Sequence, residues 1–535
     1  MTPRHRFLPV ALAAALALAP GCGHKQSVGA PPANNVLRLP LLSDPTTFDP
    51  AKVEDGTTID VLQQIFEGLV QWTPQNTLAP ALAEKWDVSP DGLTYTFHLR
   101  PGAKFQDGTS VTAQAVYFSL RRALDPALKS TVALSYLGDI QGAKELNSGK
   151  TKDLTGVKVI GPQTVAITIT APKAYWLFTL TYPTGYVLSP AEAKDGIELT
   201  DADIIKGAGT GAFKLTGYQR SAKVTLTANA AYWGGAPKLA GQERPIIENA
   251  GTRHDEYVAG QLDIVDEAKG DLDADRKDPA LKDQIHYWPR AQTFYVGLNE
   301  KTVPAFADVR VRQALAYATD KTRIRSVAMR DTVNTAEDLL PEGIPGFNPA
   351  FKGYPYDPAK ARILLAQAGY PGGKGFPVIN VTFRESYPDL SKTVDLLRDM
   401  WQTNLGITVQ PKVMEWATLL DQEHTNSLDC YHIRWAADYL DPQDFYSILL
   451  RTGAGENHTF YSNPKFDALV DKADVERDPK TRAPLYRQAA RIAADDVPVI
   501  PLYYQKDIEL VKPYVKNLDD GLMGHLPYKN LTLAK

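Results

Sequence analysis

Residues 94–124 read TYTFHLRPGAKFQDGTSVTAQAVYFSLRRAL, and this stretch contains the two patterns that decide the fold class. Apolar and polar residues alternate over residues 94–99, which predicts a strand with one buried face. Asp107 and Gly108 are typical of a turn. Thr112, a residue type that favours helix N-caps, then precedes apolar residues at helical spacing. A strand followed closely by a helix indicates an α/β or α+β protein.

The same two patterns continue along the chain. Residues 164–170 predict another half-buried strand. Residues 357–369 begin with Asp-Pro, end with Gly and carry apolar residues at i, i+3, i+4 and i+7, which predicts a helix. The same spacing follows Asp308 and covers residues 466–473. Because single cores stop growing near about 250–300 residues, a chain of 535 residues is expected to form at least two lobes.

Composition excludes several classes of protein. Hydrophobic residues make up 44% of the chain and charged residues 22%, which are ordinary values for a globular protein. Lys and Arg number 58 against 62 Asp and Glu, so no basic field favours nucleic acid as a partner. The only cysteines, Cys22 and Cys430, are too few for a disulfide scaffold or an all-thiolate zinc site.

The N-terminal residues predict export. Residues 7–20 are uncharged and apolar, yet they are shorter than the roughly 20 residues that cross a bilayer, so residues 1–21 are predicted to be a signal peptide. The sequence around Gly21 and Cys22 resembles a bacterial lipobox, which implies a lipid on Cys22. Residues 22–35 then have the composition of a flexible tether. The alternative is ordinary signal cleavage with Cys22 incidental. In either case Cys430 is expected to be a small buried hydrophobe.

Common catalytic motifs are missing. Residues 207–212, GAGTGA, lack the third glycine of a dinucleotide loop and precede a strand rather than a helix, so they are predicted to form a turn. No GxSxG, HExxH or GxxxxGK motif occurs. Cys430 and His432, with His424 nearby, offer thiolate and imidazole ligands, but alternate residues of a strand share a face without implying a metal. Asp438 and Asp441 are too common a pair to indicate a glycosidase. The sequence therefore predicts neither an enzyme nor a cofactor or metal site.

Several segments together identify a family. Their order and spacing resemble those of the peptide-binding solute-binding proteins of bacterial ABC importers, family 5, over roughly residues 36–535. The segments are Phe48-Asp49-Pro50, Ile65 to Leu69, Leu82 to Trp86, Tyr95 to Arg100, Lys104 to Thr109, Gly209 to Leu215, Tyr232-Trp233, Asp308 to Leu315 and Trp435 to Tyr439.

The resemblance implies an α/β, two-lobed periplasmic-binding-protein fold of class II with an extra subdomain in the first lobe. More than one crossing strand would join the lobes. The implied division is lobe I from residues 36–75, 195–290 and 505–535, an inserted subdomain at 76–194, and lobe II at 291–504.

The resemblance also implies a ligand site. In oligopeptide and dipeptide binders, the aspartate of the segment that reads Trp435 to Tyr439 here holds the amino terminus of the ligand, and Asp438 occupies that place. A buried ammonium needs such a carboxylate. The competing interpretation is a loop carboxylate that caps a helix or faces solvent.

Other family positions would contact the rest of the ligand. Val53, Glu54 and the stretch from Arg434 to Ala436 match segments that bind a peptide backbone. Trp416 and Trp435 match ligand-facing tryptophans of the family, and Tyr504 is a third candidate for an aromatic pocket wall. For each of them the alternative is a place in the buried core. His432 stands where the family has a basic residue for the ligand carboxylate, and Ser391 falls near a histidine position. Arg434 or Arg384 would then replace these positions as the anchor for the ligand carboxylate.

The predicted function is therefore capture of a small peptide and its delivery to a membrane permease and its ATPase. The protein would be a monomer in the periplasm or at the outer face of the cytoplasmic membrane, lipid-anchored, with no nucleic-acid partner. One alternative is the same importer class with an oligosaccharide, a nickel chelate or haem as ligand. The other is an exported hydrolase.

Overall fold

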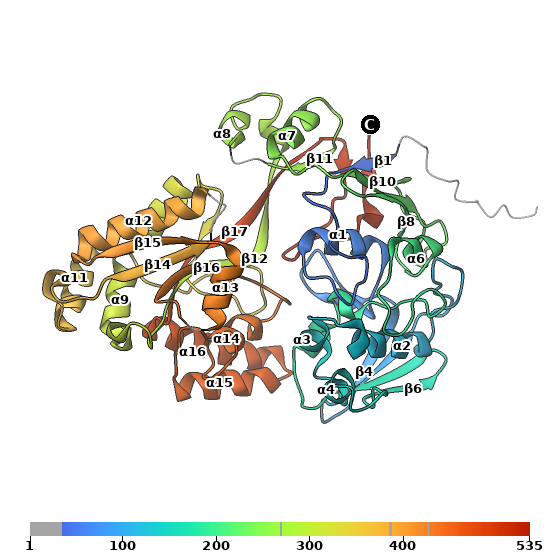
Figure 1. Cartoon of the computed structure of the whole chain (residues 1–535), viewed down its shortest axis with the longest axis horizontal. Coiled ribbons are helices and arrows are strands. Elements are labelled where there is room, and N and C mark those ends of the chain that lie inside the picture. Colours follow the sequence, from blue (N-terminus) through green and yellow to red (C-terminus); the bar gives the residue numbers. More distant parts are fainter. Residues whose placement is uncertain (1–34, 268–269, 385–387, 426) are drawn as a thin grey trace, which may run out of the picture. The chain divides into compact units, whose positions relative to one another are not determined.

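The computed structural model describes residues 35–535 except 268–269, 385–387 and 426. The predicted signal peptide, nearly all of the tether and Cys22 lie outside the described residues. Strands and helices alternate through the described part, as the sequence predicts (Figure 1). Within this part, every helix is too short or too polar to cross a bilayer.

A four-stranded sheet, ordered β1-β10-β9-β8, forms the centre of the first lobe. β1 is parallel to β10, and the other neighbours are antiparallel. The strands are far apart in the sequence, because β1 precedes and β8 follows the predicted inserted subdomain. Their bounds are β1 (Val36–Arg38), β8 (Phe213–Gln219), β9 (Lys223–Ala228) and β10 (Gly241–Pro245).

Two glycines bring the loop before β8 against helix α1 (Gly56–Ile65). A Cβ atom on Gly209 would overlap the carbonyl oxygen of Ile65, and one on Gly211 would lie 2.5 Å from the carbonyl oxygen of Gln64. Only glycine therefore allows the two backbones to approach this closely. The strand begins at Phe213, which confirms the prediction of a turn that leads into a strand.

A second four-stranded sheet, entirely antiparallel and ordered β4-β5-β7-β6, belongs to the predicted subdomain. Helix α2 packs against it, and the Thr112 hydroxyl caps this helix by accepting a hydrogen bond from the Ala115 N–H at 3.3 Å. The strand and helix predicted from residues 94–124 are confirmed. The bounds are β4 (Ala83–Val88), β5 (Thr94–Leu99), β6 (Val157–Gly161), β7 (Thr164–Thr168), α2 (Ala113–Ala123), α3 (Ala133–Leu137), α4 (Ala143–Asn147) and α5 (Trp176–Thr179).

A seven-stranded mixed sheet, with the path β11-β17-β12-β16-β14-β15 and β13 beside β17, forms the second lobe. Asp308 and Asp357 cap α9 and α11 as predicted, and Cys430 is a fully buried free thiol in the core. The strands are β11 (Ile264–Asp266), β12 (Ile285–Leu298), β13 (Asn334–Thr335), β14 (Ile379–Arg384), β15 (Val409–Met414), β16 (Cys430–Ala436) and β17 (Val499–Val511). The helices are α9 (Val309–Tyr317), α10 (Lys321–Arg323), α11 (Pro358–Gln367), α12 (Pro388–Leu405), α13 (Trp416–His424), α14 (Gln443–Leu450), α15 (Pro464–Val475) and α16 (Pro479–Asp496).

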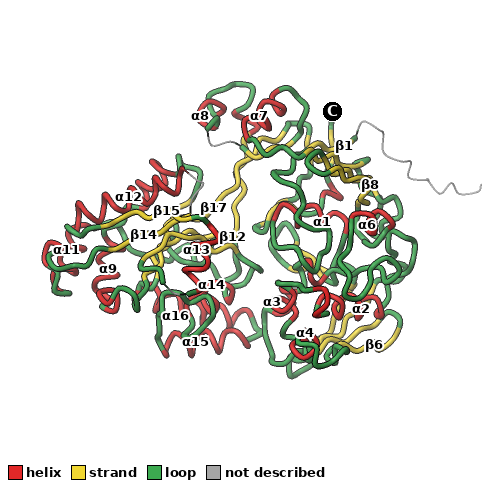
Figure 2. The backbone as a smooth tube through the Cα atoms, viewed as in Figure 1, coloured by secondary structure: helices red, strands yellow, loops and turns green. Residues whose placement is uncertain are grey.

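The long strands β12 and β17 are shared by both lobes. Figure 2 shows them side by side as continuous strands that reach from the second lobe to the elements around β11. Their register shifts between Pro289 and Thr293, so the ladder is interrupted there. The implied boundaries at residues 290/291 and 504/505 fall inside these strands. The exact division into lobes stays a prediction.

Short elements complete the fold. A hairpin of β2 and β3 spans the implied start of the subdomain at residue 76, and small ladders of the C-terminal tail pack on the first lobe. The remaining bounds are β2 (Val70–Trp72), β3 (Leu78–Pro80), α6 (Asp201–Lys206), α7 (Ala250–Val258), α8 (Leu272–Asp275), β18 (Val515–Lys516), β19 (Asp520–Gly521), β20 (Gly524–His525) and β21 (Thr532–Leu533).

Candidate ligand-binding site

Strand β16 presents an open edge just before Asp438. Its pairing with β12 continues to Ala436, but its pairing with β14 ends at His432. From residue 433 to 436, the side of β16 that faces β14 therefore has no strand partner among the described residues. Such an edge offers backbone N–H and C=O groups to an extended ligand. Arg434 and Ala436, both predicted ligand contacts, lie on it.

Asp438 follows this edge and is partly buried. Its carboxylate accepts a hydrogen bond from the Tyr136 hydroxyl at 3.2 Å. Among the described residues, no lysine or arginine forms an ion pair with Asp438. Burial raises the pKa of Asp438, because loss of water disfavours the charged form and the tyrosine hydroxyl offsets this only in part. A cation at this carboxylate would restore the lost stabilisation.

A second carboxylate, that of Asp444, lies behind the first. One of its oxygens accepts from the Asp438 backbone N–H at 3.0 Å and from the Trp435 indole N–H at 3.1 Å. Asp444 is fully buried, and burial, then the neighbouring Asp438, raise its pKa well above the ordinary value. Asp444 thus fixes both the Asp438 loop and the ring of Trp435. The site therefore contains two neighbouring acidic groups, Asp438 and Asp444.

Tyrosines of the subdomain connect Asp438 to Val53. Tyr136 stacks on Tyr182, with ring centroids 3.6 Å apart and planes 8° from parallel. The Tyr182 hydroxyl donates to the carbonyl oxygen of Val53 at 2.9 Å. Glu54, which follows Val53, is exposed and accepts a hydrogen bond from the Thr131 hydroxyl. The two tyrosines thus link Asp438 to the segment that contains Val53 and Glu54, in which Val53 is fully buried. Sequence reasoning missed Tyr136 and Tyr182, which no motif marked.

A separate cavity of about 930 Å³ lies along the crossing strands. Its volume falls in the range of small-molecule sites. Charged side chains of both signs and a group of aromatic rings line it. The lining residues are Leu39 to Leu42, Gly56, Thr57, Asp60, Arg244, Ala250, Ile264 to Glu267, Gly270, Phe294, Met329, Arg330, Arg384, Asp389, Leu390, Trp416, Leu419, His432 to Arg434, Tyr503, Gln505 to Glu509, His525 and Tyr528.

His432 lies at the aromatic end of this cavity. It is 2% exposed, and neither ring nitrogen has a hydrogen-bond partner. The ring stacks on Phe294, with centroids 5.7 Å apart, and lies 6.2 Å from that of Tyr503. Burial lowers the pKa of His432 to about 3, so the imidazole is neutral at physiological pH. In this environment His432 is able to form hydrogen bonds but does not supply a positive charge.

Arginines provide the positive charge that His432 lacks. The Arg384 guanidinium lies over the Trp416 ring, 4.6 Å from the ring centre. Arg434 is exposed and donates to the Gln292 side-chain oxygen at 2.9 Å. Both arginines and Trp416 line the cavity. Their roles as anion anchor and aromatic wall stay predictions.

Arg244 is a cavity residue that sequence reasoning missed. It is 2% exposed and pairs with Asp60 through one terminal nitrogen. Its Nε and the other terminal nitrogen have no hydrogen-bond partner, so this buried guanidinium retains unused donors. Nothing in the sequence around Arg244 distinguishes it from other arginines, because its pairing with Asp60 joins distant segments.

Tyr504 lies outside both the Asp438 site and the lining of the cavity. It is 6% exposed, and its hydroxyl donates to the Asp338 carbonyl oxygen at 3.0 Å while accepting from the Asp338 N–H at 3.2 Å. In this geometry Tyr504 fixes the loop before residue 339, and its role as a ligand contact stays a prediction.

Comparisons with known proteins identify the family. Residues 77–457 match the model described as bacterial extracellular solute-binding proteins, family 5 Middle. The chain is 32% identical over 493 residues to the probable deoxycholate-binding periplasmic protein YgiS of Escherichia coli K12, covering 90% of each chain. It is 31% identical over 500 residues to the periplasmic oligopeptide-binding protein OppA of the same organism, covering 91% of this chain and 90% of OppA.

A solved structure, that of Haemophilus influenzae OppA in complex with the peptide RPPGFSPFR, superposes with a TM-score of 0.72 at 27% identity. The match covers 94% of this chain and all of that one. The resemblance and the two-lobed α/β fold expected from the sequence are thereby confirmed. The chain belongs to the bacterial extracellular solute-binding proteins of family 5.

Proposed function

We propose that this protein is the extracytoplasmic substrate-binding component of an ABC importer, that its ligand is a peptide, and that it is not an enzyme. The observation that carries the peptide assignment is the Asp438 carboxylate, which lies at the end of an open strand edge. Within the part of the chain that the structure describes, its one side-chain hydrogen-bond partner is the neutral Tyr136 hydroxyl. The names of relatives that bind oligopeptides and murein peptides support the same ligand class.

In this proposal the amino terminus of the peptide binds Asp438. The ammonium supplies the cation that the two buried carboxylates lack, and the Asp438 carboxylate ionises fully when it arrives. The peptide backbone then pairs with the open edge of β16 between Arg434 and Ala436. Tyr136 and Tyr182 of the subdomain form the opposite wall, held in place by the hydrogen bond from the Tyr182 hydroxyl to the Val53 carbonyl.

The carboxyl end of the peptide points toward the cavity. An extended chain rises about 3.3 Å per residue, so the step from Asp438 back to His432 spans at most about 20 Å and accommodates a peptide of up to roughly six residues. At that end, Arg384, Arg434 or the unused donors of Arg244 receive the carboxylate, since the neutral His432 does not. Trp416 and Phe294 contact apolar side chains of the ligand.

Calorimetry with short peptides tests the amino anchor. We expect Asp438→Asn to weaken binding at least about tenfold, because one charge-assisted hydrogen bond contributes roughly 1.5–3 kcal/mol. Asp421→Asn, at an exposed carboxylate on α13, serves as the matched control and should bind as the wild type does. N-acetylated peptides should bind the wild type weakly and should show no further loss in Asp438→Asn. Equal affinity of wild type and Asp438→Asn across the peptide panel would refute the anchor.

Native mass spectrometry of the purified protein tests the ligand class. We expect retained masses that correspond to short peptides. Relatives include proteins named for deoxycholate and for haem, and the aromatic end of the cavity suits such rings. A retained bile acid, haem, sugar or nickel chelate would overturn the peptide assignment while leaving the importer role intact. Turnover of peptides or glycosides by the pure protein would overturn the importer role itself.

We further propose that the mature protein is a monomer held at the outer face of the cytoplasmic membrane by a lipid on Cys22. The lipobox-like sequence before Cys22 and the tether that follows support this. Radiolabelled palmitate should enter the wild-type protein and should not enter Cys22→Ser. Release of both proteins into the soluble fraction without label would contradict the anchor.

A further inference from the structure

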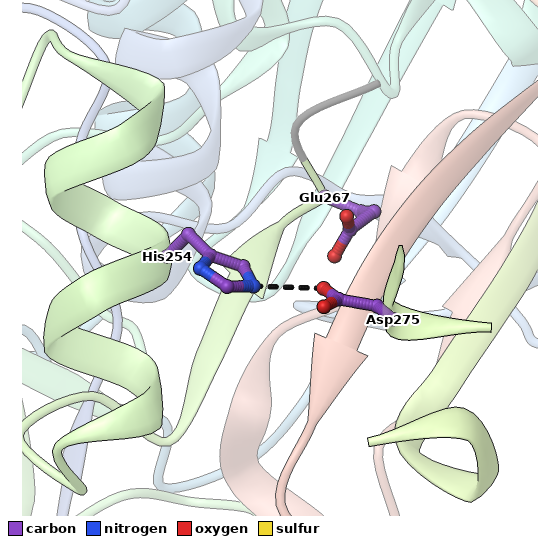
Figure 3. Close-up of side chains that lie close together, drawn as sticks. All are labelled: His254, Glu267 and Asp275. Carbon is purple, nitrogen blue, oxygen red and sulfur yellow. Dashed lines mark hydrogen bonds and ion pairs between the residues drawn. The ribbon is translucent and has the colours of Figure 1, made fainter. Parts of the chain in front are cut away.

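A histidine and two carboxylates converge near β17, beyond the residues assigned to peptide binding. His254 lies on α7, Glu267 follows β11 directly, and Asp275 is the last residue of α8. One ligand atom from each lies within 4.8 Å of the others. Figure 3 shows the three side chains pointing toward one another from three separate segments. Glu267 also lines the cavity.

The two carboxylates are buried with little to neutralise them. Asp275 is 4% exposed and lies 2.7 Å from His254 Nε2. Glu267 is 6% exposed, and neither of its oxygens has a hydrogen-bond donor. Among the described residues, no lysine or arginine forms an ion pair with Glu267. A buried acceptor without a donor is destabilising, and more so when the group is charged.

A cation between these groups accounts for the arrangement. The imidazole and the carboxylates are ligands that a first-row divalent metal takes together. Ca²⁺ and Mg²⁺ prefer oxygen-only sites, so the histidine favours zinc. Bonds of about 2.0–2.2 Å to zinc place neighbouring ligand atoms roughly 3.3 Å apart, and ligand atoms already within 4.8 Å reach that geometry by small side-chain rotations.

We propose that His254, Glu267 and Asp275 bind a divalent transition metal of the zinc class. Three protein ligands leave a fourth tetrahedral position for water. The metal would join α7, β11 and α8, and β11 is hydrogen-bonded to the crossing strand β17. The site therefore stabilises the segment that attaches to one of the two strands shared by the lobes.

Calorimetric titration of the EDTA-treated, full-length protein with ZnCl₂ tests the proposal. We expect one equivalent of zinc to bind, with MnCl₂ binding more weakly and CaCl₂ not at all. His254→Asn should weaken zinc binding by at least about 100-fold, since it removes a direct ligand. His286→Asn is the matched control, because His286 stacks on Trp288 on β12 and lies outside the cluster, so it should bind zinc as the wild type does.

A second variant separates metal binding from folding. Glu267→Gln keeps the shape of the side chain but removes an anionic ligand. It should keep the circular dichroism and the metal-free urea midpoint of the wild type while losing the rise in midpoint that zinc produces. If wild type, His254→Asn and Glu267→Gln bind zinc equally, or if the wild type binds none, the proposal is wrong, and the two carboxylates share a proton instead.

Discussion

Each end of the cavity contains a histidine, and the two histidines differ in charge state. His432, among Phe294 and Tyr503, has its pKa lowered to about 3 by burial alone. At the other end His525 lies 2.8 Å from Glu509 and 2.8 Å from Asp520, and these carboxylates overcome burial and raise its pKa to about 10. Burial thus makes a histidine neutral where nothing opposes it, whereas two neighbouring carboxylates outweigh burial and keep His525 charged.

This difference divides the cavity into an aromatic end, at which Arg384 rather than the histidine is charged, and an ionic end around His525. The ionic end is further reinforced by Arg290, which pairs with Asp520 at 2.9 Å and with Asp507 at 2.5 Å. The register of β12 and β17 shifts directly after this arginine. The ion pairs thus fix the C-terminal tail to the crossing strands at the point where the regular ladder is interrupted.

His525→Gln should give the largest effect on stability. The folded-state pKa of about 10 lies above the ordinary value of 6.5, so the stabilisation by His525 is fully present below pH 6.5 and disappears as the pH rises through 10. We expect the variant to lose on the order of 3 kcal/mol of unfolding free energy near pH 6. Urea unfolding at pH 6, 8 and 10 measures this. A constant difference between wild type and variant across that range would contradict a charged His525.

Removal of one acidic neighbour should give an intermediate effect. In Glu509→Gln, the carboxylate that contributes most to the raised pKa of His525 is absent. The pKa of His525 should then fall by about one to two pH units, since Asp520 remains. A titration of the imidazole proton signals by NMR measures the shift, with His525→Gln used to assign the signal. An unchanged titration would show that Asp520 alone sets the pKa.

His432→Phe should give the smallest effect. The neutral ring is surrounded by aromatic side chains and has no hydrogen-bond partner to lose, so a swap of similar volume should cost below about 1.5 kcal/mol. The difference should be constant above about pH 7.5. It should shift in favour of the variant as the pH falls through 6.5 toward 5, because the unfolded His432 takes up a proton there and the folded His432, with its pKa lowered to about 3, does not. A difference that stays constant from pH 9 down to pH 5 would mean that His432 takes up its proton in the folded protein as readily as in the unfolded chain.

The sequence predicted local structure well where the cause was local. Thr112 and Asp357 cap their helices because their side chains accept hydrogen bonds from N–H groups three residues on, within the same short segment. The turn at residues 209–211 was also predictable from its glycines and the strand after it. These features depend on residues that are close together in the sequence, so the sequence alone is enough to predict them.

The candidate site was only partly predictable, because its contacts join distant segments. Asp438 was found through the family resemblance, but the hydroxyl that bonds it comes from Tyr136, some 300 residues earlier in the chain. The neutrality of His432 and the unused donors of Arg244 depend on burial by several strands and helices. The implied lobe boundaries fall within β12 and β17, because a strand shared by two lobes has no break in its sequence pattern.

The contact between Tyr136 and Asp438 also bears on the speed of exchange. A binding protein that delivers its ligand repeatedly needs rapid dissociation as well as affinity. An internal ion pair at the site would have to break each time the ligand binds and re-form each time it dissociates. The phenol instead bonds the acid without opposing charge, so in the peptide proposal an arriving ammonium need not displace a competing cation. A departing ammonium likewise leaves behind an acid with a ready hydrogen-bond partner, which keeps the barrier to unloading low.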